Sequence, residues 1–129
     1  MQANNDSNRR LVYFADHNHA FVKSFLHYMN GSSGVDLRTF SFGGELIGAL
    51  STQPALLVIN GYFDSGIGFD IASIARQRFW NLTIVLILES DSIELQKKAI
   101  AVSPLCSLIM PVDFRDLKDI ILKTGGMSG

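Results

Sequence analysis

The chain has 129 residues, of which 47% are hydrophobic and 18% are charged, and these proportions are typical of one folded domain. The formal net charge is −1 and Lys and Arg form no basic stripe, so we expect no direct binding of nucleic acid by this segment. The longest apolar run, residues 84–88, is too short to span a membrane, so no membrane association is expected. The single cysteine, Cys106, excludes an internal disulfide, which suits a reducing compartment, so a cytoplasmic location is expected.

The first half of the chain alternates between strand-like and helical apolar patterns. Residues 11–14 are a short apolar run that predicts a strand. Apolar residues at helical spacing predict a helix over 21–29, which His17 or Asn18 can cap. Residues 35–42 alternate between apolar and polar and predict a second strand, and residues 43–50 predict a second, short helix.

The second half of the chain continues the same alternation. Residues 56–59 form a continuous apolar run after Pro54, which is typical of a parallel strand covered on both faces. After a predicted loop at 61–68, the remaining elements are, in order, a helix around 71–75, a strand at 82–88, a helix at 93–101, a strand at 105–110 and an amphipathic helix at 114–121.

This order predicts an α/β fold, a doubly wound five-stranded parallel sheet with helices on both faces. We expect residues 10–123 to form the domain, residues 1–9 to be disordered, and residues 124–129 to be a flexible tail or the start of a linker. In such folds the functional site lies at the carboxyl ends of the strands. The residues that end or directly follow a predicted strand are Asp16, Asn60, Glu89 and Met110.

The residues at the strand ends form a recognisable series. The first strand ends in Ala15-Asp16, the third leads from Pro54 to Asn60, the fourth ends in Glu89-Ser90, and the fifth ends in Met110-Pro111 after Ser107. Over residues 10–123 this arrangement resembles the receiver domains of bacterial two-component systems. The closing stretch, residues 111–117, is similar to the usual ending of that family, whereas the loop at 64–68 keeps only its last glycine.

The resemblance implies a phosphorylation pocket that has lost its chemistry. Receiver domains hold Mg²⁺ with two acidic residues, and they carry a phosphoacceptor Asp, a hydroxyl and a Lys at the positions of Asn60, Glu89 and Met110. An amide has no anionic oxygen to attack phosphorus, Asp16 alone is a poor Mg²⁺ ligand set, and Met110 cannot neutralise a phosphoryl group. We therefore predict a degenerate pocket without catalytic residues, metal or cofactor, formed by Ala15, Asp16, Asn60, Glu89, Ser90 and Met110.

Each altered position also has a purely structural interpretation. Asn60 can cap a strand end or turn, Asp16 can cap the first helix, and Met110 can fill the space of the absent Lys. Glu89 can simply be solvated. The sharper hypothesis is that the Glu89 carboxylate accepts a hydrogen bond from Asn60 or Ser90 and thereby holds the adjacent loop in one state.

Other candidate sites are weaker. His17 and His19 have a spacing that rarely aims two imidazoles at one ion, so no metal site is predicted. Asp64 or Asp16 as a residual phosphoacceptor is a minor hypothesis, because Asp64 lies in the following loop. Cys106 is expected to be a buried strand residue. The aromatic pair Phe79-Trp80 either packs under the next loop or forms a binding hot spot.

The favoured function is a regulatory module that acts by protein–protein interaction without phosphorylation. The resemblance implies a binding face over residues 92–101, Ser107 and residues 114–123, and the candidate interface residues are Ser107, Phe114, Leu117, Phe79 and Trp80. The partner is expected to be another protein or a tethered output domain, and a homodimer is a further candidate assembly. The alternative function is a small-ligand sensor that uses the vacated pocket lined by Met110, Asn60 and Ala15.

Overall fold

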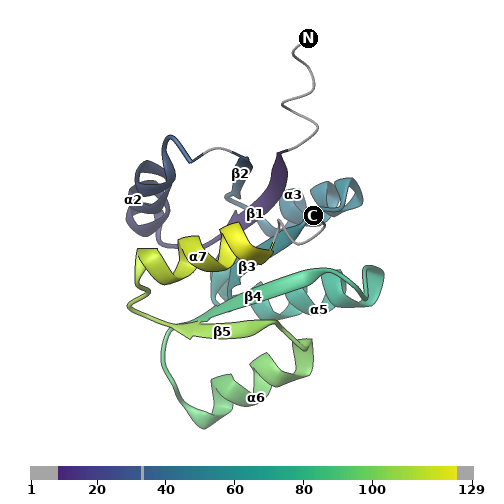
Figure 1. The fold of residues 1–129 in the computed structure, drawn as a ribbon. Coiled ribbons are helices and arrows are strands. Elements are labelled where there is room, and N and C mark those ends of the chain that lie inside the picture. Colours follow the sequence, from purple (N-terminus) through teal and green to yellow (C-terminus); the bar gives the residue numbers. More distant parts are fainter. Residues whose placement is uncertain (1–8, 33, 125–129) are drawn as a thin grey trace.

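The computed structural model describes residues 9–32 and 34–124, and its centre is a five-stranded sheet in the order β2-β1-β3-β4-β5 (Figure 1). Each pair of neighbouring strands runs parallel. The strands are β1 (Arg10–Ala15), β2 (Val35–Phe40), β3 (Leu56–Asn60), β4 (Thr83–Leu88) and β5 (Cys106–Ile109). The predicted fold class is therefore confirmed.

Helices cover both faces of this sheet (Figure 1). Their bounds are α2 (His19–Met29), α3 (Gly43–Ala49), α4 (Phe63–Gly66), α5 (Gly68–Arg78), α6 (Ile93–Val102) and α7 (Phe114–Thr124), with a 3-10 turn, η1, at Leu50–Thr52. Buried side chains of α2 and α7 pack against one face, and buried side chains of α3, α5 and α6 pack against the other. The molecule thus has three layers, as expected for strands joined by helical crossovers.

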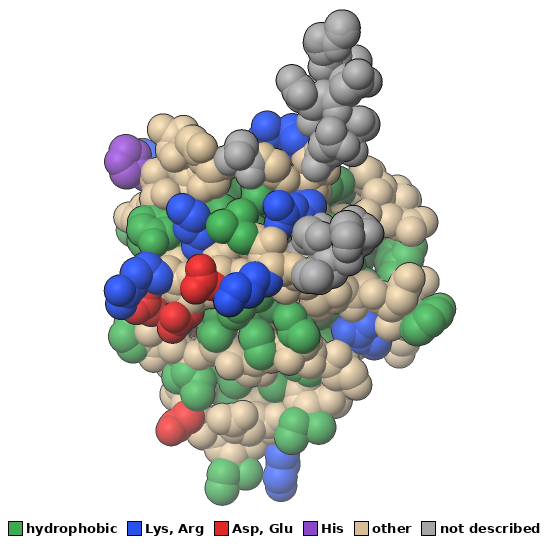
Figure 2. Space-filling view, in the orientation of Figure 1, with side chains coloured by type: hydrophobic (Ala, Val, Ile, Leu, Met, Phe, Trp, Pro, Cys, Tyr) green, Lys and Arg blue, Asp and Glu red, His purple; other side chains and the backbone are tan. Residues whose placement is uncertain are grey.

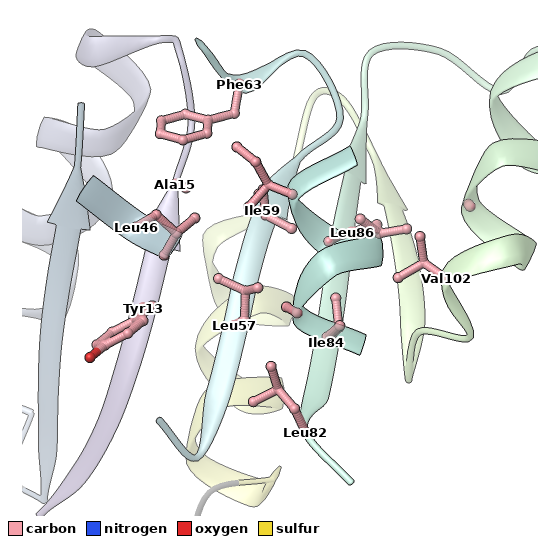
Figure 3. Close-up of a cluster of buried hydrophobic side chains, with 14 of the residues drawn as sticks. Tyr13, Ala15, Leu46, Leu57, Ile59, Phe63, Leu82, Ile84, Leu86 and Val102 are labelled. Carbon is pink, nitrogen blue, oxygen red and sulfur yellow. The ribbon is translucent and has the colours of Figure 1, made fainter. Parts of the chain in front are cut away.

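The sheet forms the core because its central strands are apolar on both faces. All five residues of β3 are buried, and alternate residues of a strand point to opposite faces. Tyr13 and Ala15 of β1 therefore contact the cluster beneath α3 and α5, whereas Val12 and Phe14 contact the cluster beneath α2 and α7. Figure 3 shows the first of these clusters, with Leu57 and Ile59 at its centre.

The structure differs from the predicted boundaries at two loops. Strand β2 ends at Phe40 and not at residue 42, because Phe42 already precedes α3 as its N-cap and is largely exposed. The segment at 61–68, predicted as a loop, contains the short turn α4, in which Asp64 and Ser65 have positive φ angles. At the start of α2, the Asn18 side chain accepts a hydrogen bond from the Phe21 N–H, as predicted for a cap.

The predicted disordered segment at 1–9 and the predicted tail at 124–129 lie almost wholly outside the described residues. Across residues 9–32 and 34–124, no helix is both long and apolar enough to cross a membrane.

Arg76 ties three segments of the fold together from α5. Its Nε donates to the Val102 carbonyl at 2.9 Å and its Nη2 to the Ser103 carbonyl at 2.9 Å. Its Nη1 donates to the carbonyls of Trp80 and Leu82 at 2.8 and 2.7 Å. The guanidinium therefore satisfies carbonyls at the C-terminal end of α6 and in the connection to β4, where a positive charge also complements the helix dipole.

We predict that Arg76→Lys lowers the free energy of unfolding by about 1–3 kcal/mol, because one ammonium cannot reach all four carbonyls. Urea denaturation followed by circular dichroism measures the change. Arg78→Lys, an exposed position on the same helix, is the matched control and should leave stability unchanged. Equal stability of the two variants would contradict this role of Arg76.

Candidate functional site

The carboxyl ends of three neighbouring strands bring polar side chains together at one edge of the sheet. Asp16 directly follows β1, Asn60 is the last residue of β3, and Glu89 directly follows β4. Strand β3 lies between β1 and β4, with Ala15 level with Ile59 and Asn60 level with Ile87. Asn60 therefore lies between Asp16 and Glu89, although 44 and 29 residues separate them along the chain.

The Asn60 side chain uses both its donors and its acceptor in this position. Its Nδ2 donates to Oδ2 of Asp16 at 3.1 Å and to Oε2 of Glu89 at 2.8 Å. Its Oδ1 accepts from the backbone N–H of Tyr62 at 2.8 Å. Two acidic neighbours require the amide nitrogen to face them, so this arrangement fixes the orientation of the amide. The structure thus contains the hydrogen bond between Asn60 and Glu89 that the sequence hypothesis proposed.

Asp16 connects this pocket to the first helix. Its side chain is buried, and its Oδ1 accepts from the Asn18 N–H at 2.8 Å, while Asn18 in turn caps α2. Asp16 therefore supports the cap without itself being the N-cap. Burial raises the pKa of the Asp16 carboxyl, while the hydrogen bonds from Asn18 and Asn60 and the charge of His17 lower it.

His17 lies at the mouth of the pocket, close to both carboxylates. Its Nδ1 is 3.4 Å from Oδ1 of Asp16, and its Nε2 is 3.8 Å from Oε2 of Glu89. Both His17 and Glu89 are partly open to solvent. In the part of the chain that the structure describes, no three His, Cys, Asp or Glu side chains are arranged to hold a metal ion.

The remaining pocket residues contribute packing and not charge. Ala15 is fully buried in the cluster beneath α3 and α5. Met110 is half-buried and packs against the cluster beneath α2 and α7. Ser90 makes only a long contact, 3.4 Å from its Oγ to the Ser92 N–H at the start of α6. The hydroxyl of Ser90 is therefore directed to α6, and the hydrogen bond that Glu89 accepts comes from Asn60.

Asp64, the minor phosphoacceptor candidate, is engaged elsewhere. Its Oδ2 accepts from the Gly43 N–H at 2.7 Å, at the start of α3. A Cβ at Gly43 would lie 2.7 Å from Cδ1 of Ile71 and 3.1 Å from the same Asp64 oxygen, so this close approach requires glycine. The carboxylate of Asp64 holds α3 against the loop after β3, and it makes no described hydrogen bond to Asn60.

The described cavities do not include the pocket residues. They are lined by residues 53–55, 79, 81 and 82, by residues on the outer side of α2, and by residues between α5 and α6. Asn60 and Ala15 are also inaccessible to solvent. The alternative function, a small-ligand sensor, therefore stays a prediction, and none of these three cavities supports it.

The candidate interface residues have different environments. Leu117 is fully buried against the sheet, so its assignment to an interface is wrong: a helical stripe alone does not tell a core leucine from a binding one. Phe114 is half-buried in an aromatic cluster with Phe21, Phe25 and Tyr28. Ser107 and Cys106 are half-buried on the edge strand β5, whereas Cys106 was expected to be a buried strand residue.

Phe79 and Trp80, which follow α5, were predicted either to pack under the next loop or to form a binding hot spot, and the two residues differ in exposure. Phe79 packs against the core, whereas Trp80 is 82% exposed. The sequence interpretation included residues 92–101 in the binding face but singled out none of the exposed apolar residues on α6 and around β5, namely Ile93, Ile100, Leu105 and Ile109. Ile93 and Ile100 are seven residues apart and share one side of α6, while Leu95, Ala99 and Val102 face the core. The sequence spacing of the apolar residues of α6 already divides them between two sides of the helix, and this division could have identified Ile93 and Ile100 as exposed.

No protein-family model and no curated protein matches the sequence. Solved structures do match. The receiver domain of Francisella response regulator 1452 has a TM-score of 0.81 at 16% identity, over 94% of this chain and 100% of that one. A DNA-binding response regulator of the LuxR family from Staphylococcus aureus has a TM-score of 0.74 at 12% identity, over 90% and 98% of the two chains.

A third similar structure is the signal receiver domain of a modulated diguanylate cyclase from Desulfovibrio desulfuricans, with a TM-score of 0.67 at 22% identity, over 90% of this chain and 93% of that one. At these identities the similarity establishes the fold. The chain therefore has the receiver fold, and the residues that form its pocket must be judged by their own chemistry.

The hydrogen bonds from the Asn60 amide to the carboxylates of Asp16 and Glu89 predict that Asn60→Asp destabilises the fold. At neutral pH, without divalent cations, this variant should lose roughly 3–5 kcal/mol of stability, because it places a third carboxylate against two others and removes both hydrogen bonds to them. Chemical denaturation at pH 7 and at mildly acidic pH measures this loss, which should shrink when the carboxylates take up protons. The control is Asn81→Asp, which adds the same charge at an exposed position. A fully stable Asn60→Asp at neutral pH would refute this account of the pocket.

The raised pKa of Asp16 predicts a pH dependence of stability. Between the pKa of an Asp in the unfolded chain and the higher pKa of native Asp16, the native state binds more protons. Stability should therefore decrease as the pH rises through this interval. Carboxyl ¹³C NMR should give a midpoint for Asp16 above that of an unfolded peptide, and Asp16→Asn should remove this part of the pH dependence. A midpoint below the peptide value would overturn the assignment.

Proposed function

We propose that this chain is a phosphorylation-independent signalling module that acts by protein–protein interaction, as the regulatory domain of a larger regulator. The observation that carries the proposal is the Asn60 amide, which donates to both Asp16 and Glu89 in the position where a receiver would carry its nucleophile. The pocket is complete in its hydrogen bonding without any phosphoryl group.

The chemistry of phosphoryl transfer supports this proposal. The amide nitrogen of Asn60 donates two hydrogen bonds and its lone pair is delocalised, so it is no nucleophile for phosphorus. Asp16 and Glu89 would repel the equatorial oxygens of an incoming phosphoryl group. Among the described residues, neither carboxylate has a Lys or Arg within ion-pair distance, and the His17 imidazole lies 3.4 Å from Asp16 and 3.8 Å from Glu89.

The hydrogen bonds also support a single, fixed state of the pocket. Asn60 holds the start of the next loop through the Tyr62 N–H, and Asp16 holds the start of α2 through Asn18. A switch needs two arrangements of similar free energy that a ligand can bias. Here one arrangement satisfies every buried side-chain polar atom among the described residues, so we infer a domain that presents its surface constitutively.

The surface of α6, β5 and α7 is the favoured interface. Strand β5 is an edge strand, and Ile93, Ile100, Leu105 and Ile109 expose apolar area on or beside it. Figure 2 shows hydrophobic side chains gathered over β5 and α6, below a row of charged side chains on α7. An apolar centre with a charged rim is the usual anatomy of a protein interface.

The partner is proposed to be another protein or a tethered output domain. Two similar receiver structures come from a DNA-binding response regulator and from a modulated diguanylate cyclase, so an output of either kind fits the proposal. Nucleic-acid binding would then belong to the output domain, since this chain has a net charge of −1. The free thiol of Cys106 suits the cytoplasm, where thiols stay reduced.

Amide NMR spectra with and without Mg²⁺ and beryllofluoride, a mimic of a phosphoryl group, test the proposal. We expect no shifts at Asn60, Glu89 or Met110. The positive control is the triple variant Asn60→Asp, Glu89→Thr, Met110→Lys, which restores the nucleophile, hydroxyl and cation and should respond in the pocket. Shifts in the unmodified chain that spread from the pocket to β5 and α7 would sink the proposal.

A further inference from the structure

The chain contains two Asn-Gly pairs, Asn30-Gly31 and Asn60-Gly61. In such a pair the backbone nitrogen of glycine can attack the side-chain amide carbon of asparagine, because glycine offers no side chain to hinder the approach and its backbone bends freely. The reaction requires a side chain that can rotate toward the following nitrogen. The two pairs meet this requirement very differently in the folded protein.

Asn60-Gly61 is held in an unreactive geometry. The Asn60 side chain is 1% exposed and all three of its hydrogen bonds would have to break before its amide carbon could reach the Gly61 nitrogen. That nitrogen itself donates to the Ile87 carbonyl at 3.0 Å. A Cβ built at Gly61 would lie 2.3 Å from the Phe69 ring, so the backbone is also enclosed by packing.

Asn30-Gly31 lies at the exposed end of α2. Both residues are exposed, and a Cβ built at Gly31 would have open space around it. The neighbouring amides of Asn30 and Ser32 donate to His27 and Met29. Within residues 9–32 and 34–124, no carbonyl accepts a hydrogen bond from the Gly31 N–H. Gly31 also has a φ of +90°, a conformation that glycine adopts readily.

We propose that Asn30 is a site of spontaneous deamidation in the native protein and that the pocket protects Asn60 from the same reaction. The Gly31 nitrogen loses its proton to solvent and bonds to Cγ of Asn30, and the Cγ–Nδ2 bond breaks with release of ammonia. Water then opens the cyclic imide. Cleavage of the bond between Cγ and the Gly31 nitrogen gives aspartate, and cleavage at the main-chain carbonyl gives isoaspartate. One water is consumed and one ammonia released, with no oxidation or reduction.

The modification changes charge and backbone at one defined place. It alters the formal net charge from −1 to −2, since one neutral amide becomes one carboxylate. The new charge lies just beyond the C-terminus of α2, where the helix dipole disfavours a negative group. Isoaspartate also adds one carbon to the backbone between α2 and β2. The inference rests on local geometry and stands independently of the proposed function.

Peptide mapping by mass spectrometry tests the proposal on the full chain, incubated at mildly alkaline pH either native or unfolded in guanidinium chloride. In the native protein Asn30 should convert to aspartate and isoaspartate, whereas Asn60 should convert at least about a hundredfold more slowly than in the unfolded chain. In the unfolded chain both should convert at similar rates. Asn81, exposed but followed by Leu82, is the internal control and should change little in either state.

Two variants sharpen the test. Gly31→Ala should slow the reaction at Asn30 in the native and the unfolded chain alike, since it hinders the attacking nitrogen. Ser32→Ala lies one residue further along and should leave the rate unchanged. Native Asn30 that stays intact while unfolded Asn30 converts would overturn the proposed site. Native Asn60 that converts as fast as Asn30 would overturn the protection by the pocket.

Discussion

The amide of Asn60 lies between two carboxylates that would otherwise repel each other at the edge of the sheet. It donates to Asp16 and Glu89 at 3.1 and 2.8 Å and accepts from Tyr62, so the ends of β1, β3 and β4 are joined through one side chain. The neutral amide avoids placing a third carboxylate beside Asp16 and Glu89.

Further side-chain hydrogen bonds join the strand ends to the neighbouring helices. Asp16 orients Asn18, and Asn18 caps α2, so the start of a helix depends on a residue that follows β1. Asp64 in the loop after β3 holds the start of α3 through Gly43. The hydrogen bonds of Asn60 also enclose the Asn60-Gly61 peptide, and we propose that this protects the amide from conversion to a carboxylate.

The pocket and the proposed interface have separate physical origins. The pocket arises from strand ends in the middle of the sheet, where the buried side chains of Asp16 and Asn60 need hydrogen-bond partners because they are withdrawn from water. The interface arises at the edge strand β5, where no further strand covers the sheet and apolar side chains of α6 remain in water.

The sequence by itself determined the layers of the fold and placed Asp16, Asn60 and Glu89 at the ends of neighbouring strands. Runs such as 56–59 are apolar at every position, which is typical of a parallel strand covered on both faces, and in a parallel sheet the polar residues that follow such runs lie at one edge. Only the tertiary structure decided which apolar side chains of a helix are exposed and which hydrogen-bond partner each polar side chain has. Leu117 and Ile100 both occur in amphipathic stripes, yet Leu117 is buried and Ile100 exposed, because the packing of each helix sets which apolar side faces the sheet. Likewise, Glu89 accepts from Asn60 on the neighbouring strand, whereas the hydroxyl of the adjacent Ser90 accepts from the Ser92 N–H at the start of α6.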